Sequence, residues 1–465
     1  MTSHPSQTIE NPFKIPAVFI SALLIVQALV LLVSLEFPIE VFAGLIGVVV
    51  LFLLFSNLFV GLCVIILMHF LVLRGSEGIS IGEVIFALCF FGYLLQWFFH
   101  KFFIDRSRLL IMPADFALAG FLMLCVFSIV PAFLQQNEML KWLRELLPFF
   151  TLLLVFPLRE LANTPRRMKI IVACFVLLGV AVAIDNLLAY RDAASSVTYL
   201  WELKSSRKAL NAPMFTGIII VASAFFVMVR SFRTRMLALM AIVVFTAALV
   251  ITFTRGYWLA TVIGVATFFV LIPVAQKMRM GMYFSAFVLL FAGAVVLFFG
   301  DLANFIWDAV GERFLSVGEA GKDLSLLNRM AEAKYVLSQI AINPVVGYGL
   351  GKTFKYPAII PYEFPTWYVH NTILFVWFKV GLPGLLCLLT FAGATFVQGL
   401  RVFRMSSNAF SKTLSVGLIA CFVALVFVSF SSPQLLERDS ALLIALLTGL
   451  IQAEWLKLQA NHDAA

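Results

Sequence analysis

Residues 236–274 read MLALMAIVVFTAALVITFTRGYWLATVIGVATFFVLIPV. Two apolar runs, 236–253 and 257–274, each about 18 residues long, are separated only by Thr254, Arg255 and Gly256. A helix of about 20 predominantly apolar residues spans the hydrocarbon core of a bilayer. The stretch therefore predicts two transmembrane helices joined by a tight turn that carries a positive charge.

Apolar runs of this kind fill most of the chain. Of its 465 residues, 62% are hydrophobic and 12% are charged, a composition typical of a polytopic helical membrane protein. Hydrophobicity predicts spans near 17–35, 39–56, 58–73, 81–100, 113–134, 146–158, 168–189, 213–229, 236–253, 257–274, 281–299, 371–398, 413–431 and 438–456. Because the runs 58–73 and 146–158 are short, we expect an all-α polytopic membrane protein with about 12–14 transmembrane helices.

This pattern divides the chain into three regions. We expect about 11 transmembrane helices with short loops over 1–299, one large loop with amphipathic helices over 300–366, and about 3 transmembrane helices over 367–465. The first apolar run follows a single Lys and has no small-residue cleavage site. We interpret it as a retained helix and not as a removed signal peptide.

Basic residues indicate which loops face the cytoplasm, because Lys and Arg accumulate there. A cytoplasmic N-terminus places these residues inside: Lys101, Arg106, Arg108, Arg159, Arg166, Arg167, Lys169, Arg230, Arg233, Arg235, Lys277, Arg279, Arg401, Arg404 and Lys412. The loop 300–366 then faces outward, and both termini are cytoplasmic. Several basic residues stay in short outer loops against the rule: Lys141, Arg144, Arg191, Lys204, Arg207, Lys208 and Arg255. A large anionic ligand on the outer face is the simplest reason for them.

Arg255 has two interpretations. Its planar guanidinium is suited to grip phosphate oxygens in a bidentate way, and Gly256 beside it leaves little steric cover. The alternative is an interfacial anchor next to an aromatic belt. Arg144 near a span end has the same two readings, as a ligand contact or as a surface or paired arginine.

Arg207 lies in a basic loop, 191–211, that precedes another predicted helix. Pro213 fits the start of that helix, and a helix N-terminus attracts anions. The loop is therefore either part of an anion site or simply solvated.

The polar loop contains an amphipathic segment and then a glycine-rich turn. Apolar residues at 326, 327, 330, 333, 336, 337 and 340 form one helical face. The turn over 343–351 reads NPVVGYGLG and includes Gly347 and Gly349. Because no βαβ unit surrounds it, it is not a dinucleotide fingerprint. We expect its backbone to approach a bulky substrate.

His370 and Asn371 stand at the end of the polar stretch, where the next apolar segment begins. A neutral imidazole can take a proton from an attacking hydroxyl, and such base catalysis contributes about 10²–10⁴-fold. The alternative is an interfacial histidine that caps the helix or bonds a loop carbonyl. Asn371 either orients the ring or caps the helix at Thr372.

Other chemistries find no support in the chain. The six cysteines lie inside apolar runs, without the spacing of a disulfide framework or a zinc site. We see no Asp-x-Asp or adjacent acidic pair in the outer loops that indicates bound Mg²⁺. The net charge of +9 is scattered between apolar runs, so topology and anionic headgroups explain it better than nucleic acid does.

Four motifs occur in order in the second half of the chain. They are Thr254-Arg255-Gly256-Tyr257-Trp258-Leu259; Asn328-Arg329; Asn343-Pro344 with Gly347-Tyr348-Gly349; and His370-Asn371 with Gly381-Leu382-Pro383-Gly384-Leu385. In this order they resemble the O-antigen ligase and O-antigen polymerase superfamily of bacterial membrane glycosyltransferases. The motifs cover about residues 250–400, and the helix pattern extends over the whole chain.

The resemblance implies a GT-C-like fold and a metal-independent transfer that uses no cofactor. A glycan moves from undecaprenyl diphosphate to an acceptor hydroxyl at the periplasmic face of the bacterial inner membrane. The resemblance further implies that His370 activates the acceptor, that the diphosphate is held by Arg255, Arg207, Arg329 and Arg144, and that the supporting residues are Asn371, Gly256, Gly347 and Gly349.

The acceptor stays open at this point. It is lipid A–core for a ligase and another lipid-linked glycan for a polymerase, and a third relative transfers glycans to protein. A solute transporter or lipid flippase is the alternative from a different class, with Asp185 and Glu83 as the main acidic residues in or near spans. We expect lipid-linked glycans and membrane lipids as partners and no nucleic acid.

Overall fold

The computed structural model describes residues 38–73, 80–196, 211–274, 277, 293, 324–357 and 366–463. Within these ranges the regular structure is helical, apart from an isolated β-bridge between Phe354 and Thr366. The predicted all-α class is therefore confirmed. The chain forms two compact units, residues 1–64 and 65–465, and the candidate site lies in the second.

Seven described helices are long and apolar enough to cross a membrane. They are Ile81–Ile104, Pro113–Leu134, Pro165–Arg191, Phe232–Ile251, Thr372–Met405, Ala409–Val428 and Arg438–Ala460. Shorter apolar helices are Gly44–Ser56, Leu58–Leu73, Ala212–Met228 and Arg255–Leu271. The chain is thus a multi-pass membrane protein. The predicted spans 17–35 and 281–299 lie outside the described residues, and the three predicted regions remain a prediction.

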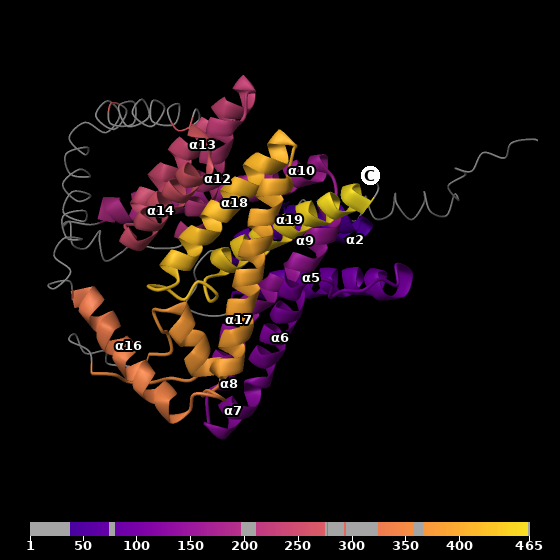
Figure 1. Cartoon of the computed structure of the whole chain (residues 1–465). Helices are drawn as coiled ribbons and strands as arrows, with labels where there is room; N and C mark the ends of the chain where they lie inside the picture. Colours follow the sequence, from indigo (N-terminus) through magenta and orange to yellow (C-terminus); the bar gives the residue numbers. More distant parts are fainter. Residues whose placement is uncertain are drawn as a thin grey trace, which may run out of the picture. The chain divides into compact units, whose positions relative to one another are not determined.

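The helices follow one another in a fixed order (Figure 1). They are α2 (Pro38–Ser56), α3 (Leu58–Met68), α4 (Phe70–Leu73), α5 (Ile81–Phe99), η1 (His100–Ile104), α6 (Pro113–Phe127), α7 (Ile129–Leu134), α8 (Met139–Phe150), η2 (Thr151–Leu154), α9 (Val155–Leu161), α10 (Pro165–Ser196), α12 (Ala212–Met228), α13 (Phe232–Ile251), α14 (Arg255–Leu271), α16 (Leu324–Ile342), α17 (Thr372–Met405), α18 (Ala409–Val428) and α19 (Arg438–Asp463).

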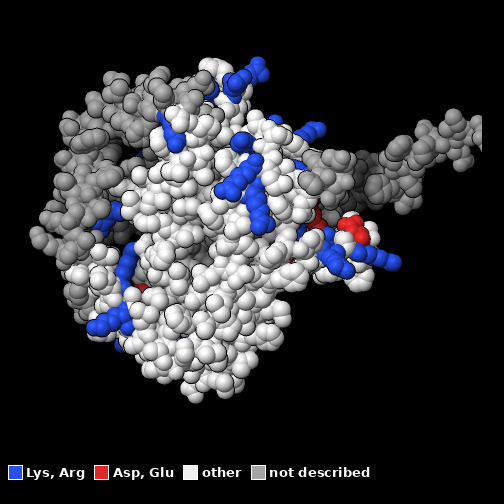
Figure 2. Space-filling view, viewed as in Figure 1, with Lys and Arg blue, Asp and Glu red and all other residues white. Residues whose placement is uncertain are grey.

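The surface is apolar where helices face outward. Leu88, Leu95 and Leu237 expose 71%, 72% and 68% of their area. Figure 2 shows a broad face with few charged side chains, on which Lys and Arg lie mainly toward the margins. Such a face suits lipid, because hydrocarbon tails do not penalise exposed apolar side chains.

Helix α12 packs against α13, α14, α18 and α19. Small residues allow the close approach. A Cβ at Gly264 of α14 would lie 2.3 Å from Ile220 Cδ1, and one at Gly217 would lie 2.7 Å from Leu443 Cδ2. Membrane helices without small residues at such contacts cannot bring their backbones this close. The core around α12 supports the start of α14, where Arg255 lies.

The predicted short span 146–158 is not one helix. Helix α8, which contains Pro148, passes through the 3₁₀ turn η2 into α9. Arg159 was predicted in a cytoplasmic loop, and this placement is wrong, because its side chain is fully buried against Asp115. A charge inside a helix bundle is retained only when it is paired. Arg159 also donates to the Leu109 carbonyl at 2.8 Å.

The predicted span 371–398 is interrupted. Helix α17 breaks at Gly381, which has φ 83° and ψ 178°, and continues from Leu382 (Figure 1). Pro383 lies just after the break, where its missing N–H does least harm. Leu382 N–H is satisfied outside the helix by the Pro344 carbonyl at 3.1 Å. The nine residues Thr372–Val380 therefore form a separate short helix that begins at the histidine motif.

We predict that Arg159→Met lowers the stability of the purified protein strongly. The change leaves the buried Asp115 carboxylate without its guanidinium, and breaking such a pair costs about 3–5 kcal/mol. Thermal unfolding in detergent measures the effect, and the double variant Asp115→Leu/Arg159→Met should recover most of the loss. Arg166→Met, on an exposed position of α10, is the control. Equal unfolding temperatures for Arg159→Met and Arg166→Met would contradict the prediction.

Candidate active site

Asn371 starts helix α17. Its side-chain Oδ1 accepts the Leu374 N–H at 3.0 Å, as an N-cap residue does, and its Nδ2 donates to the Phe430 carbonyl at 3.2 Å. Of the two roles expected for Asn371, the structure shows the cap. The orientation of the His370 ring comes from elsewhere.

Glu332 of α16 holds His370 at two points. Its Oε1 accepts the His370 backbone N–H at 2.6 Å, and its Oε2 lies 2.9 Å from the ring Nδ1. The Glu332 side chain is 2% exposed, whereas that of His370 is 31% exposed. The carboxylate therefore fixes the ring from the protein side, and the imidazole stays accessible.

Sequence reasoning missed Glu332 because it chose the wrong face of α16. The predicted apolar face included Leu326, Met330 and Leu337, which are 40%, 61% and 47% exposed. The buried residues are Asn328, Glu332, Val336 and Ile340, spaced by four. An acidic residue and an asparagine on the same stripe as Val336 and Ile340 were the available signal.

The loop between α18 and α19, residues 429–437, binds the segment that carries His370. Thr372 N–H donates to the Ser429 carbonyl at 2.8 Å, and Thr372 Oγ1 donates to the Ser432 carbonyl at 2.9 Å. Gln434 N–H donates to Thr372 Oγ1 at 2.9 Å. We call residues 429–437 the hub loop.

Two of the predicted arginines meet the hub loop at Ser431. Arg329 Nη1 donates to the Ser431 carbonyl at 3.1 Å. The backbone of Gly256 passes so near that a Cβ there would lie 3.6 Å from Ser431 Oγ. Arg255 and Arg329 thus come to the same loop as His370, although they are far apart in sequence.

The turn before Arg255 is strained. Phe253 is 5% exposed and has φ 51°, a left-handed conformation that bulky residues rarely adopt. Such strain costs about 1–3 kcal/mol and is concentrated at functional sites. The turn ends the predicted run 236–253 and starts α14 at Arg255, with Thr254 as its N-cap residue.

Glu437, at the end of the hub loop, accepts three hydroxyl groups. Ser432 Oγ lies at 2.6 Å, Tyr257 Oη at 2.7 Å and Tyr368 Oη at 3.4 Å. Burial raises the pKa of the Glu437 carboxyl, and the hydroxyl donors and His370 oppose this shift. Burial also raises the pKa of the Tyr368 hydroxyl, so this group is a donor at neutral pH.

The other predicted arginines do not join this group in the described structure. Arg207 lies outside the described residues. Arg144 is exposed on α8, beside the buried Glu145. The α12 N-terminus, expected to attract an external anion, is approached by the protein's own Asp439, which accepts the Met214 N–H at 3.3 Å.

The glycine-rich turn approaches the protein itself. Gly347, Gly349 and Gly351 are buried with φ of 75°, 80° and 75°. A Cβ on Gly349 would lie 2.4 Å from Ala132 N of α7, and one on Gly347 would lie 2.7 Å from Gly381 N of α17. The expected close approach of this backbone is therefore to its own helices, which leaves no room for a bulky substrate at these glycines.

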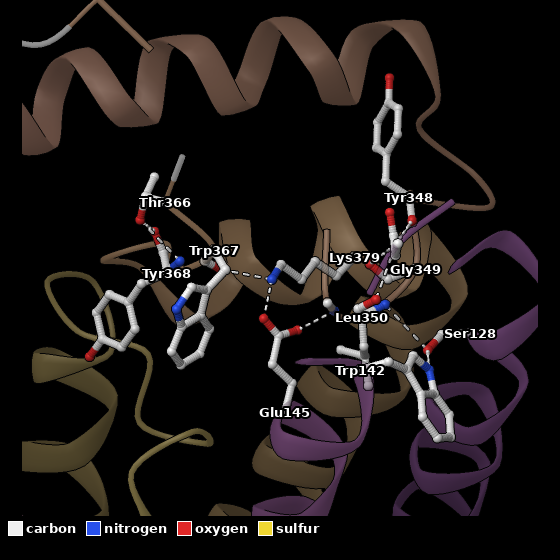
Figure 3. A network of polar contacts seen from close by, with 12 residues as sticks. Ser128, Trp142, Glu145, Tyr348, Gly349, Leu350, Thr366, Trp367, Tyr368 and Lys379 are labelled. Carbon is white, nitrogen blue, oxygen red and sulfur yellow. Dashed lines mark hydrogen bonds and ion pairs between the residues drawn. The ribbon is translucent and has the colours of Figure 1, made fainter. Parts of the chain in front are cut away.

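A buried ion pair fixes the turn and the histidine segment from below (Figure 3). Lys379 of α17 pairs with Glu145 of α8 and donates to the Trp367 carbonyl at 2.7 Å. The second Glu145 oxygen accepts the Gly351 N–H at 2.8 Å. Both strands of the loop that lead to and from α17 are thus tied to one carboxylate.

The described residues contain no group of three His, Cys, Asp or Glu side chains that could hold a metal ion. One acidic pair was overlooked in the sequence, because Glu437 and Asp439 flank Arg438 at an outer loop. The two carboxylates have different partners, hydroxyl groups for Glu437 and a helix N-terminus for Asp439.

Fold and site together define a multi-pass helical membrane protein with a histidine–carboxylate pair and two arginines around one interhelical loop. Residues 239–389 match the family described as O-antigen ligase, which confirms the resemblance to the O-antigen ligase/polymerase superfamily and supports a function of that general type. A comparison with curated proteins found no match. The matched residues include Arg255, Arg329, Glu332 and His370, whereas Glu437 and the rest of the hub loop lie beyond them.

We predict that Gly349→Ala lowers the unfolding temperature in detergent. The new Cβ meets the α7 backbone at a positive φ, which adds about 1–3 kcal/mol of backbone strain to the overpacking. Gly393→Ala is the matched control, because a Cβ at that position of α17 meets nothing within 4 Å. It should leave the protein as stable or stabilise it by about 0.5–1 kcal/mol. A Gly349→Ala protein as stable as the control would show that the turn tolerates a side chain.

Proposed function

We propose that the protein is a glycosyltransferase of the O-antigen ligase type. It moves a glycan from undecaprenyl diphosphate to an acceptor hydroxyl at the periplasmic face of the bacterial inner membrane. The observation that carries the proposal is the His370–Glu332 pair, held beside Arg255 and Arg329 by the hub loop. The outward orientation of this site rests on the distribution of Lys and Arg along the chain.

His370 is the base in this proposal. When Nδ1–H donates to Glu332, the neutral ring presents its Nε2 lone pair for a proton. The acceptor hydroxyl gives that proton to Nε2 as its oxygen forms the new bond to the anomeric carbon. The imidazolium that results faces the Glu332 carboxylate, which stabilises it as a charge-assisted pair.

The arginines serve the leaving group. As the glycosidic bond to the diphosphate breaks, the negative charge on the departing oxygen grows, and guanidinium groups already in place stabilise it. Arg255 stands at the first position of α14, where helix N–H groups also favour an anion. Arg329 lies one turn from Glu332 on α16, so one helix positions both the base and a cation. Arg207 and Arg144 remain further candidates for the same role.

Attack by the activated hydroxyl from the face opposite the diphosphate inverts the anomeric configuration. No step in this scheme requires a metal ion, because the guanidinium groups supply the positive charge at the diphosphate. Linkage analysis of the transferred glycan tests the stereochemistry.

The acceptor decides between ligase and polymerase. The purified protein is given a lipid-linked glycan donor and either lipid A–core or a second lipid-linked glycan. Product with lipid A–core supports the ligase, and product only with the lipid-linked glycan identifies a polymerase. Uptake of substrate into vesicles that is indifferent to changes at His370 would instead favour a transporter.

We predict that His370→Ala lowers kcat for glycan transfer by about 10²–10⁴-fold, because general base catalysis contributes that much. Glu332→Gln removes the charge that stabilises the imidazolium, a hydrogen bond of about 1.5–3 kcal/mol, and should lower kcat by about 10- to 150-fold. Glu138→Gln is the control for loss of a carboxylate, because Glu138 pairs only at the exposed surface with Lys141. Full activity of His370→Ala would remove the assignment of the base.

We predict that Arg255→Ala reduces kcat/KM for the lipid-linked donor by about 10- to 150-fold, the loss of a charge-assisted hydrogen-bonded contact. Arg255→Lys should recover only part of it, since an ammonium cannot bind two phosphate oxygens in the same fork. Initial rates at varied donor concentration measure both. Arg233→Ala, on an exposed position of α13, is the control. If Arg255→Ala keeps the donor KM and kcat of the unaltered protein, Arg255 is an interfacial anchor only.

A further inference from the structure

The three hydroxyl donors of Glu437 come from both sides of the site. Tyr257 lies on the first turn of α14, two residues after Arg255, and its hydroxyl is 2.7 Å from Glu437 Oε2. Tyr368 lies two residues before His370, and its hydroxyl is 3.4 Å from Glu437 Oε1. One carboxylate therefore connects the arginine turn with the histidine segment.

The direction of the Tyr257 bond follows from its neighbours. Gln434 Oε1 accepts the Ser440 hydroxyl at 2.8 Å, which turns Gln434 Nε2 toward Tyr257 Oη, also at 2.8 Å. Since an amide N–H only donates, Tyr257 Oη accepts from Gln434 and has its own proton left for Glu437. Hydroxyl bonds to a carboxylate are among the stronger hydrogen bonds in proteins.

The Tyr368 contact reaches His370 itself. The two rings meet edge to face, with centroids 4.8 Å apart and an angle of 73° between their planes. This is a favoured arrangement of aromatic rings. The imidazole is thus held at Nδ1 by Glu332 and on its ring by Tyr368, whose hydroxyl points to Glu437.

We propose that Glu437 is a positioning residue that fixes the Arg255 turn and the His370 ring at one separation. The inference rests on the proposed function, in which Arg255 binds the donor diphosphate and His370 activates the acceptor. Transfer requires the two substrates to meet in a near-attack arrangement, and a misplacement of about 1 Å can lower the rate about 10²-fold. Glu437 touches neither reacting atom and acts through Tyr257 and Tyr368.

The experiment uses the full-length protein in detergent with undecaprenyl-diphosphate-linked glycan as the varied donor and a fixed concentration of the acceptor that supports transfer. Tyr368→Phe loosens only the histidine side and should lower kcat about 2- to 12-fold with an unchanged donor KM. Tyr257→Phe loosens only the arginine side and should raise the donor KM by a similar factor. Both factors correspond to one neutral hydrogen bond.

Glu437→Gln should affect both parameters and lower kcat/KM about 10²-fold. Adding Tyr257→Phe and Tyr368→Phe to the Glu437→Gln protein should then change the rates less than about 2-fold, because the connection is already lost. Glu437→Asp, which keeps the charge, should recover part of the activity. Glu138→Gln is again the control, and thermal unfolding confirms that each variant is folded.

Three results would overturn the inference. Glu437→Gln protein with unaltered kcat and donor KM would mean that the residue is dispensable. A lower unfolding temperature with unaltered kinetics per folded molecule would limit it to anchoring the start of α19. Fully multiplicative effects of the two tyrosine changes in the Glu437→Gln protein would show that Glu437 does not connect them. His370→Ala in the same assay separates the cases, since its full activity refutes the proposed base whatever Glu437 does.

Discussion

The last carbonyl groups of an α-helix have no hydrogen-bond partner within the helix, and leaving them bare in an apolar environment is costly. After α18 four successive carbonyls, those of Ser429, Phe430, Ser431 and Ser432, accept hydrogen bonds from other segments. The donors belong to Thr372, Asn371 and Arg329. The requirement to satisfy one helix end therefore gathers the start of α17 and the basic side of α16 at one place.

Buried charges contribute a second constraint. Lys379 and Glu145 form a fully buried pair, and each also binds a backbone group of the polar loop, at Trp367 and at Gly351. Neither charge has another way to be compensated inside the bundle. The break of α17 at Gly381 lies next to this pair, and the glycine-rich turn packs into it. A short helix that carries the histidine motif at its start is thus fixed at both of its ends.

Much of this could be predicted from the chain. Hydrophobic runs predict the all-α membrane class, because a bilayer admits few alternatives for a buried backbone. Asn371 was recognised as a helix cap from its position, and the family motifs led to His370, Arg255 and Arg329. The break in α17 was not predicted, although Gly381 and Pro383 were visible. Hydropathy windows average over such residues.

The carboxylates that complete the site were missed for a different reason. Glu332 lies 38 residues before His370, and Glu437 lies 180 residues after Tyr257, so no local pattern relates them. An acidic residue in a polar loop looks the same whether it is solvated or buried against a histidine. The glycines at 347 and 349 were correctly expected to permit close approach, but what approaches them depends on the packing of α7 and α17.

By itself the sequence determined the solvent for which this protein is built, the helices that cross it, and the residue types available for chemistry, because burial in lipid depends on composition over short windows. Only the tertiary structure decided which carboxylate meets His370 and which helix ends share the hub loop. Those contacts arise where unsatisfied carbonyls and buried charges from distant segments must find partners.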